Sequence, residues 1–77
     1  MNLDSTNFMD KTQYLIKENW KQVNLMLYEK NGQEIFFDNS NLIEFQKTNK
    51  STKDVLNIRV QTLQDLINFL DSIKKNV

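Results

Sequence analysis

Carboxylates are the residues in this sequence whose spacing comes closest to a catalytic arrangement. Glu29 and Glu34 flank the dipeptide Asn31-Gly32, and Asp38 and Glu44 flank a second polar segment. Two carboxylates can hydrolyse a glycosidic bond or hold Mg²⁺. Catalysis requires burial or a close like charge to shift a carboxyl pKa, whereas residues beside turns are usually solvated. We therefore expect no catalytic role for these four carboxylates.

The other side chains that enzymes commonly use are missing. The 77 residues include no His and no Cys, which excludes an imidazole base, a thiolate nucleophile and a zinc site of the usual ligands. The single Gly excludes the glycine-rich loops that bind phosphates and dinucleotides. The sequence therefore predicts a protein that is not an enzyme and that carries neither a metal ion nor another cofactor.

Basic side chains cluster in the second half of the chain, at Lys47, Lys50, Lys53 and Arg59. Such a strip could neutralise phosphates and bind nucleic acid in a salt-dependent way. However, the net charge of the chain is zero, and no aromatic residue lies between these cations to stack on bases. A solvated loop is the favoured interpretation, and nucleic-acid binding through these four residues is the alternative.

The dipeptide Asn31-Gly32 predicts a β-hairpin. A two-residue turn would place Glu29 opposite Glu34, which is a like-charge clash. A three-residue loop, with Gly32 in the left-handed region, avoids this clash and segregates the apolar residues onto one face. We predict the second register, in which that face carries Val23, Leu25, Leu27, Ile35 and Phe37.

This register leaves a second apolar set on the opposite face of the hairpin, namely Met26, Tyr28 and Phe36, with Leu42 beside them. If the helices cover the first face, these side chains are exposed. Large exposed apolar groups surrounded by charge are typical of a protein contact. The alternatives are that the N-terminal helix or a second copy of the chain covers this face.

The clearest predicted helix spans residues 62–75. Thr62 and Asp65 have the spacing of a capping box at its start. Its apolar residues recur at helical spacing and form one stripe, which comprises Leu63, Leu66, Ile67, Leu70 and Ile73.

Two further strands are predicted by alternation, over residues 55–60 and 42–47. The first has Leu56, Ile58 and Val60 on one face, and the second has Ile43 and Phe45 inward. A short helix is the alternative for residues 42–47. The polar residues 48–53 between the two strands predict a loop that closes a long hairpin.

The first twenty residues predict a helix from about Phe8 to Asn19, with a strand through Tyr14 and Ile16 as the alternative. A broad helical face could hold Phe8, Met9, Leu15, Ile16 and Trp20. We expect Trp20 to be a core residue and not a platform for a ligand.

Together these elements predict a single small α+β domain over residues 1–77. It has an N-terminal helix, a three- or four-stranded antiparallel meander, and a C-terminal amphipathic helix, with both helices packed on one sheet face. The missing Cys, the absence of a signal peptide and the lack of any apolar run near roughly 18 residues predict a cytoplasmic protein without membrane contact.

The function predicted from the sequence is that of a small non-enzymatic protein-binding module with an unidentified partner protein. Residues with AT-rich codons (Asn, Lys and Ile) are abundant, which favours an inhibitor or accessory protein of a phage, prophage or plasmid. Two alternatives remain: a nucleic-acid-binding domain, and a structural homodimer that compensates for the thin core of a short chain.

Overall fold

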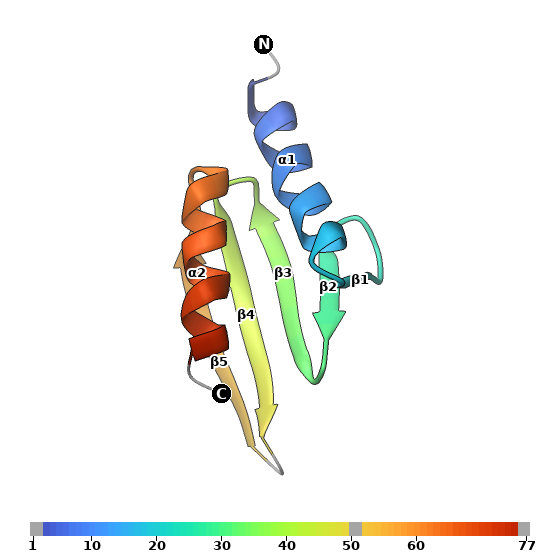
Figure 1. The fold of residues 1–77 in the computed structure, drawn as a ribbon, viewed down its shortest axis with the longest axis vertical. Coiled ribbons are helices and arrows are strands. Elements are labelled where there is room, and N and C mark those ends of the chain that lie inside the picture. Colours follow the sequence, from blue (N-terminus) through green and yellow to red (C-terminus); the bar gives the residue numbers. More distant parts are fainter. Residues whose placement is uncertain (1–2, 50–51, 76–77) are drawn as a thin grey trace.

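The computed structural model describes residues 3–49 and 52–75 and shows two helices on one face of an antiparallel sheet (Figure 1). The sheet has five strands in sequence order, so each strand pairs with its neighbour along the chain. This confirms the predicted α+β meander, with five strands in place of three or four. The elements are α1 (Leu3–Lys17), β1 (Lys21–Gln22), β2 (Leu27–Lys30), β3 (Gln33–Asn39), β4 (Leu42–Asn49), β5 (Thr52–Arg59) and α2 (Leu63–Lys75).

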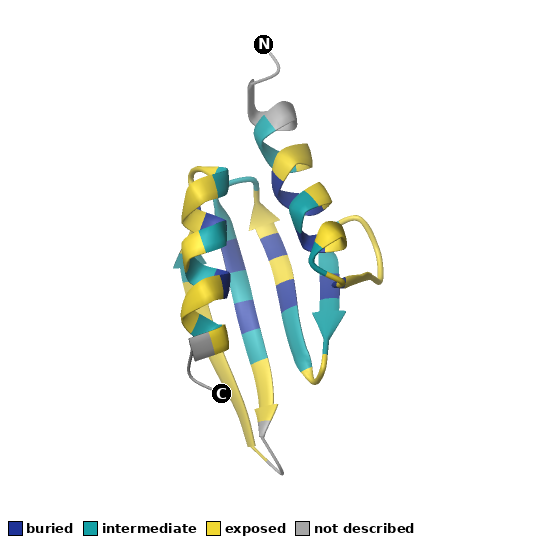
Figure 2. Ribbon diagram, viewed as in Figure 1, coloured by how far each residue is buried: buried dark blue, intermediate teal, exposed yellow. Residues whose placement is uncertain are grey.

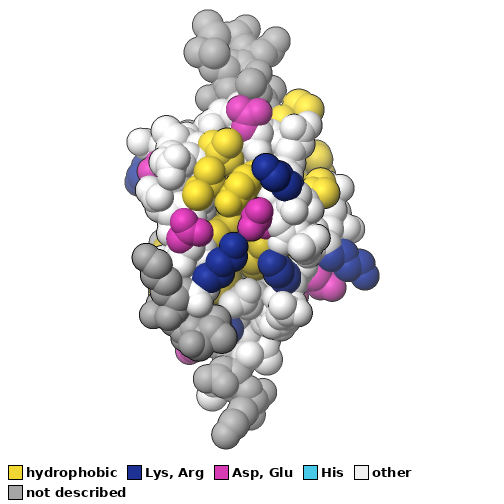
Figure 3. Space-filling view, in the orientation of Figure 1, with side chains coloured by type: hydrophobic (Ala, Val, Ile, Leu, Met, Phe, Trp, Pro, Cys, Tyr) yellow, Lys and Arg dark blue, Asp and Glu magenta, His cyan; other side chains and the backbone are white. Residues whose placement is uncertain are grey.

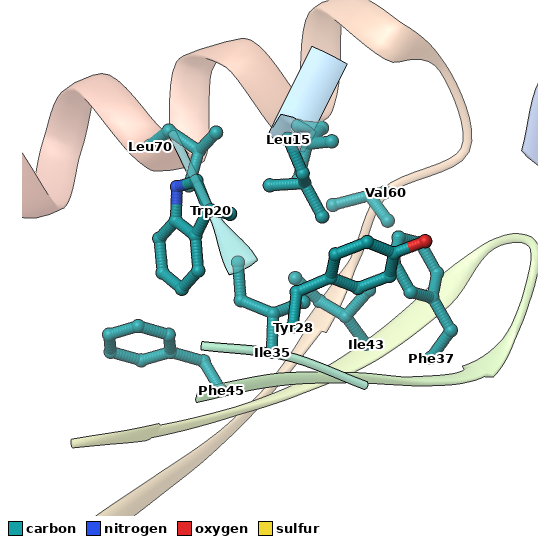
Figure 4. Packing of buried hydrophobic residues seen from close by; sticks show 10 residues of the cluster. Leu15, Trp20, Tyr28, Ile35, Phe37, Ile43, Phe45, Val60 and Leu70 are labelled. Carbon is teal, nitrogen blue, oxygen red and sulfur yellow. The ribbon is translucent and has the colours of Figure 1, made fainter. Parts of the chain in front are cut away.

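The core lies between the helices and the sheet. Each central strand directs alternate residues toward the helices, and these are the buried ones (Figure 2). Some hydrophobic side chains still reach the surface between the two helices (Figure 3). The buried hydrophobic residues are Leu15, Trp20, Tyr28, Ile35, Phe37, Ile43, Phe45, Val60, Leu66 and Leu70 (Figure 4).

Aromatic rings connect the two helices to the strands. Phe8 of α1 packs edge-on against Phe37 of β3 with ring centroids 5.1 Å apart, and Phe69 of α2 packs in the same way against Phe45 of β4 at 5.1 Å. Such edge-to-face pairs contribute roughly 0.5–1.5 kcal/mol beyond their buried area. Trp20 is also in this core, as predicted.

The β2–β3 hairpin has the other register from the one predicted. Asn31 and Gly32 have φ angles of 51° and 80°, which is the signature of a two-residue type I′ turn. Glu29 is therefore opposite Glu34, and Tyr28 is opposite Ile35. A like-charge pair costs roughly 0.2–1 kcal/mol, whereas burying one large apolar side chain contributes roughly 1.5–3 kcal/mol. Burial of Tyr28 in this register outweighs the clash.

The change of register also corrects the predicted core face. Ile35 and Phe37 are buried as expected, but Val23 and Leu25 are 47% and 65% exposed. Both lie in the connection between β1 and β2, where the Asn24 side chain accepts hydrogen bonds from the backbone N–H groups of residues 26 and 27 at 2.9 and 3.0 Å. Leu27 is half-buried and points to the sheet face that the helices leave open.

The C-terminal helix α2 begins at the predicted capping box. The Asp65 N–H donates to Thr62 Oγ1 at 3.1 Å, and the Thr62 N–H donates to Asp65 Oδ2 at 3.2 Å. Leu66 and Leu70 of its apolar stripe are buried, and the remaining stripe residues are half-buried. Both the helix and its cap are therefore confirmed.

The N-terminal helix α1 is confirmed, with different ends and a different buried face. It ends in a Schellman motif: Asn19 has a φ of 72°, and the Trp20 N–H donates to the Leu15 carbonyl at 2.9 Å. Met9 and Ile16 were expected on the core face, but they are 54% and 49% exposed. Their places on that face are taken by polar residues.

Lys11 is the most unusual of these polar residues, because it is fully buried. Its Nζ donates to the carbonyl oxygens of Ser40, in the β3–β4 turn, and of Gln61, just before α2. Asn7 Nδ2 also donates to the Gln61 carbonyl, at 2.8 Å. Helix α1 is thus hydrogen-bonded to the end of the sheet where two connections meet.

Residues 42–47 form a strand, so the helix alternative there is wrong. Strand β4 continues to Asn49 and β5 begins at Thr52, which makes the connection shorter than the predicted loop at 48–53. Ile43 and Phe45 are buried as predicted. Residues 50–51, which include Lys50, lie outside the described residues.

Candidate functional site

The outer side of β5, which we call the open edge, is the longest strand edge without a strand partner among the described residues. Strand β5 is last in the sheet order and pairs with β4 over all eight of its residues. Seven of these eight are exposed and only Ile58 is half-buried (Figure 2). Within residues 3–49 and 52–75, no other strand pairs with this edge.

The hydrogen-bond pattern shows which β5 residues present their backbone outward. The Val60 N–H donates to the Asn41 carbonyl at 2.7 Å, so this pair is of the hydrogen-bonded type. Such pairs recur at every second residue of an antiparallel ladder. Even-numbered residues of β5 therefore direct their N–H and C=O groups to β4. The outward-facing groups belong to Lys53, Val55, Asn57 and Arg59.

Two large apolar side chains flank this open edge. Val55 is 46% exposed on the sheet face without helices, and Leu56 is 51% exposed on the helix-covered face. Charged residues surround them, with Lys53 and Asp54 on one side and Arg59 on the other. Exposed apolar groups beside unpaired strand backbone are the features that allow another strand to pair.

The opposite edge of the sheet differs. It is formed by β1, which has only two residues, and α1 packs near it (Figure 1). Very short edge strands prevent unwanted pairing. The two edges are therefore unequal, and only β5 presents a long ladder.

The sheet face without helices adjoins the open edge. One row across it runs from Leu27 through Phe36 and Glu44 to Asn57. Phe36 is 38% exposed, and carboxylates surround it. Besides Glu44, these acidic residues are Glu29, Glu34 and Asp38.

The structure does not bring the predicted protein-binding residues Met26, Tyr28, Phe36 and Leu42 together. Tyr28 is fully buried, and Met26 is half-buried against the core. Phe36 and Leu42 point to the other face. The cause is the hairpin register, because the backbone N–H of Phe37 donates to the Met26 carbonyl and thereby places Met26 on the core side. The predicted protein-binding surface is therefore wrong.

The predicted basic strip is divided between the two faces of the sheet. Lys47 alternates with the buried Phe45 and lies on the helix-covered face, whereas Lys53 and Arg59 lie on the opposite face. Lys50 is outside the described residues. Lys53 and Arg59 share their face with four carboxylates, a charge pattern that does not favour a phosphate backbone.

The carboxylates considered for catalysis lie on the open sheet face or at its end. Glu29 and Glu34 are directly opposed and half-buried, and Asp38 is exposed. Among the described residues, no group of three or more His, Cys, Asp or Glu side chains is placed to hold a metal ion. In the same part of the chain, no helix is long and apolar enough to cross a membrane.

A cavity of about 350 Å³ opens on the helix-covered face near the C-terminal ends of α1 and α2. Three of its charged side chains already have partners: Lys74 Nζ is 3.1 Å from Glu18 Oε1, and Lys30 Nζ donates to the backbone carbonyl of Glu18 at 2.8 Å. The hydrogen bond from Lys74 to the Glu18 carboxylate and the charge of that carboxylate raise the pKa of Lys74. The other lining residues include Trp20, Lys47, Leu70 and Ile73.

Comparisons with protein-family models, curated proteins and solved structures gave no match.

The open edge was not predicted from the sequence, although part of the signal was present. Val55 and Leu56 are adjacent apolar residues, so one of them must face away from the core whichever way the strand is oriented. That observation alone points to an exposed apolar side chain on β5.

Proposed function

We propose that this chain is a non-enzymatic protein-binding module that takes an extended segment of a partner protein along β5. The observation that carries the proposal is the open edge, an eight-residue strand with outward-facing backbone groups and no strand partner among the described residues. Strand addition uses these groups for affinity and side-chain contacts for specificity. Val55 and Leu56 supply apolar contacts on the two faces of the added strand.

The edge also lacks two features with which proteins often block such pairing, a proline and a β-bulge. The chain contains no proline, and the pairing of β4 with β5 runs without a register shift over the residues described. The charged residues Lys53, Asp54 and Arg59 limit pairing with unrelated strands. The edge therefore combines accessibility with some selectivity.

The biological setting belongs to the same proposal and rests on composition. A cytoplasmic inhibitor or accessory protein of a phage, prophage or plasmid is consistent with the absence of Cys and the abundance of Asn, Lys and Ile. Binding by such a protein requires no catalytic group.

A proline at position 57 tests the proposal. The Asn57 N–H faces outward, so Asn57→Pro removes a donor of the open edge without removing a bond to β4. Tagged wild-type protein, Asn57→Pro and the matched control Asn57→Ala are used to capture partners from cells, and bound proteins are identified by mass spectrometry. We expect a specific partner with the wild type and Asn57→Ala, and its loss with Asn57→Pro.

Capture of the same partner by all three proteins contradicts the proposal. Circular dichroism of Asn57→Pro shows whether a loss of binding is accompanied by a loss of fold. Hydrogen exchange gives a second measurement: amides of the outward-facing residues should become protected when the partner is added, and amides of Leu56 and Ile58 should change little.

A further inference from the structure

We propose that the strand added at the open edge is the β5 strand of a second copy of this chain. The two strands run antiparallel about a two-fold axis that passes beside Asn57, so that the two sheets become one. This inference rests on the proposed function and names its partner. An isologous pair of this kind is the commonest form of protein assembly.

Four two-fold registers bring the middle of the two strands together, with the axis at Asp54, Val55, Leu56 or Asn57. An axis at Asp54 would place the two Asp54 carboxylates opposite each other, so three registers remain. Each joins outward-facing residues of one copy to outward-facing residues of the other, as the hydrogen-bond pattern requires. Directly opposed side chains lie on the same face about 4.5–5.5 Å apart, so their chemistry distinguishes the registers.

Two of these registers oppose unsuitable side chains. With the axis at Val55, the Asp54 carboxylate lies opposite Leu56 of the second copy, which places a charge against an apolar group. With the axis at Leu56, Lys53 lies opposite Arg59 of the second copy. By symmetry each unfavourable contact occurs twice, and like charges directly opposed are destabilising.

Within β5 itself, the register with its axis at Asn57 avoids both problems, because Asp54 then lies opposite Val60, a buried residue that follows the end of the strand. Leu56 lies opposite Ile58 of the second copy, and the symmetric contact repeats this apolar pair. Val55 lies opposite Arg59, whose aliphatic stem can cover it while the guanidinium stays in water. This register also forms as many hydrogen-bonded residue pairs as the one with its axis at Val55.

The exposure of the paired residues agrees with this arrangement. Leu56 points to the helix-covered face and is nevertheless 51% exposed, and Ile58 beside it is half-buried. Pairing with a second copy covers both. The zero net charge of the chain means that two copies do not repel each other as whole molecules.

A single-strand contact buries little surface, at the low end of specific interfaces. We therefore expect a dimer that forms at micromolar or higher concentration. Sedimentation equilibrium between about 10 µM and about 1 mM should show a monomer–dimer equilibrium for the wild type and for Asn57→Ala. The variant Asn57→Pro should remain monomeric.

A cysteine scan tests the register, because the chain has no native Cys. Only the residue beside the axis meets its own copy at about 5.5 Å between Cα atoms, within the reach of a disulfide. One residue away from the axis, this separation rises to about 7–8 Å. Under mild oxidation, Asn57→Cys should therefore form covalent dimers at least about tenfold faster than Val55→Cys or Leu56→Cys.

The same oxidation in guanidinium chloride is the control, where all three cysteine variants should react at one rate. Faster reaction of Val55→Cys or Leu56→Cys under native conditions overturns the register, and equal native rates together with a monomeric wild type overturn the second copy as partner. If the wild type is monomeric but Asn57→Pro still abolishes capture of another protein, strand addition stands and only the dimer fails. If Asn57→Pro changes neither the dimerisation nor the capture of another protein, both proposals fail.

Discussion

Lys11 offers the sharpest test of how this small fold is held together. Its side chain is fully buried, and its ammonium donates to the carbonyls of Ser40 and Gln61. A hydrogen bond to a charged group contributes about 1.5–3 kcal/mol, and the contribution is smaller where water can replace the donor. Because Ser40 is half-buried and Gln61 is exposed, we expect Lys11→Met to lower the free energy of unfolding by about 1.5–2 kcal/mol.

The variant Lys11→Ala separates packing from hydrogen bonding. Met keeps the length of the apolar part of the lysine side chain, whereas Ala also removes three buried methylene groups at about 0.8 kcal/mol each. The expected loss for Lys11→Ala is therefore about 4 kcal/mol, which is comparable with the whole stability expected for 77 residues, about 4–12 kcal/mol. Much of this variant should be unfolded at physiological temperature.

Urea denaturation followed by fluorescence gives the measurement, since Trp20 is the only tryptophan and lies in the core. Lys17→Met is the matched control, because Lys17 is an exposed lysine on the same helix and its loss should change stability by less than about 0.5 kcal/mol. If Lys11→Met is as stable as the wild type, the ammonium gains no more from the carbonyls than it loses by burial, and the reasoning is refuted. Equal losses of stability in Lys11→Met and Lys11→Ala would refute the expected contribution of the buried methylene groups.

Three further predictions concern the hairpin, the helix cap and the pH dependence. Glu34→Lys should raise the free energy of unfolding by about 0.5 kcal/mol, because it converts the like-charge pair with Glu29 into an opposite-charge pair; a loss of stability would contradict the register. Thr62→Ala should cost about 1 kcal/mol by thermal or urea denaturation, since it removes the α2 cap. Burial and then the charge of a nearby carboxylate raise the pKa of Tyr14, and a hydrogen bond to a carboxylate raises that of Lys74. Both groups hold their protons more tightly in the folded chain than in the unfolded chain. Their contribution to the free energy of unfolding is therefore complete below about pH 10 and declines as the pH rises through the raised pKa values. Between about pH 9 and about pH 11, Tyr14→Phe should lose less stability in urea than the wild type, and an equal loss would exclude this role for Tyr14.

Features encoded within a few residues were predictable from the sequence. The capping box of Thr62 and Asp65 lies within one helical turn, and the apolar stripe of α2 repeats every three or four residues, so neither depends on distant contacts. The same holds for the existence of the Asn31-Gly32 turn. The register of the β2–β3 hairpin was not predictable from the local sequence. It depends on whether the like-charge clash or the burial of Tyr28 has the larger effect, and that burial depends on residues distant in the sequence.

The candidate site was hidden for a related reason. Strand β1 is only Lys21–Gln22 and has no apolar alternation, so the sequence gives no sign of which strands end the sheet. The burial of Lys11 was not predictable, because a lysine in a helix is normally solvated and the carbonyls of Ser40 and Gln61 that it binds belong to two separate connections. The exposure of Leu56 depends on where α2 crosses the sheet. This position depends on the side chains of both the helix and the sheet, so it could not be predicted from β5 alone.

The sequential order of the strands has a consequence for how the chain folds. Every strand pairs with its neighbour in sequence, so the whole sheet can form from successive hairpins that close short loops at little entropic cost. The contacts that join the ends of the chain are different: Asn7 binds the Gln61 carbonyl, and Glu18 binds Lys74. Since these contacts require a formed sheet, we expect the helices to dock after the folding transition state. Substitutions that remove these contacts should accelerate unfolding and leave the folding rate nearly unchanged.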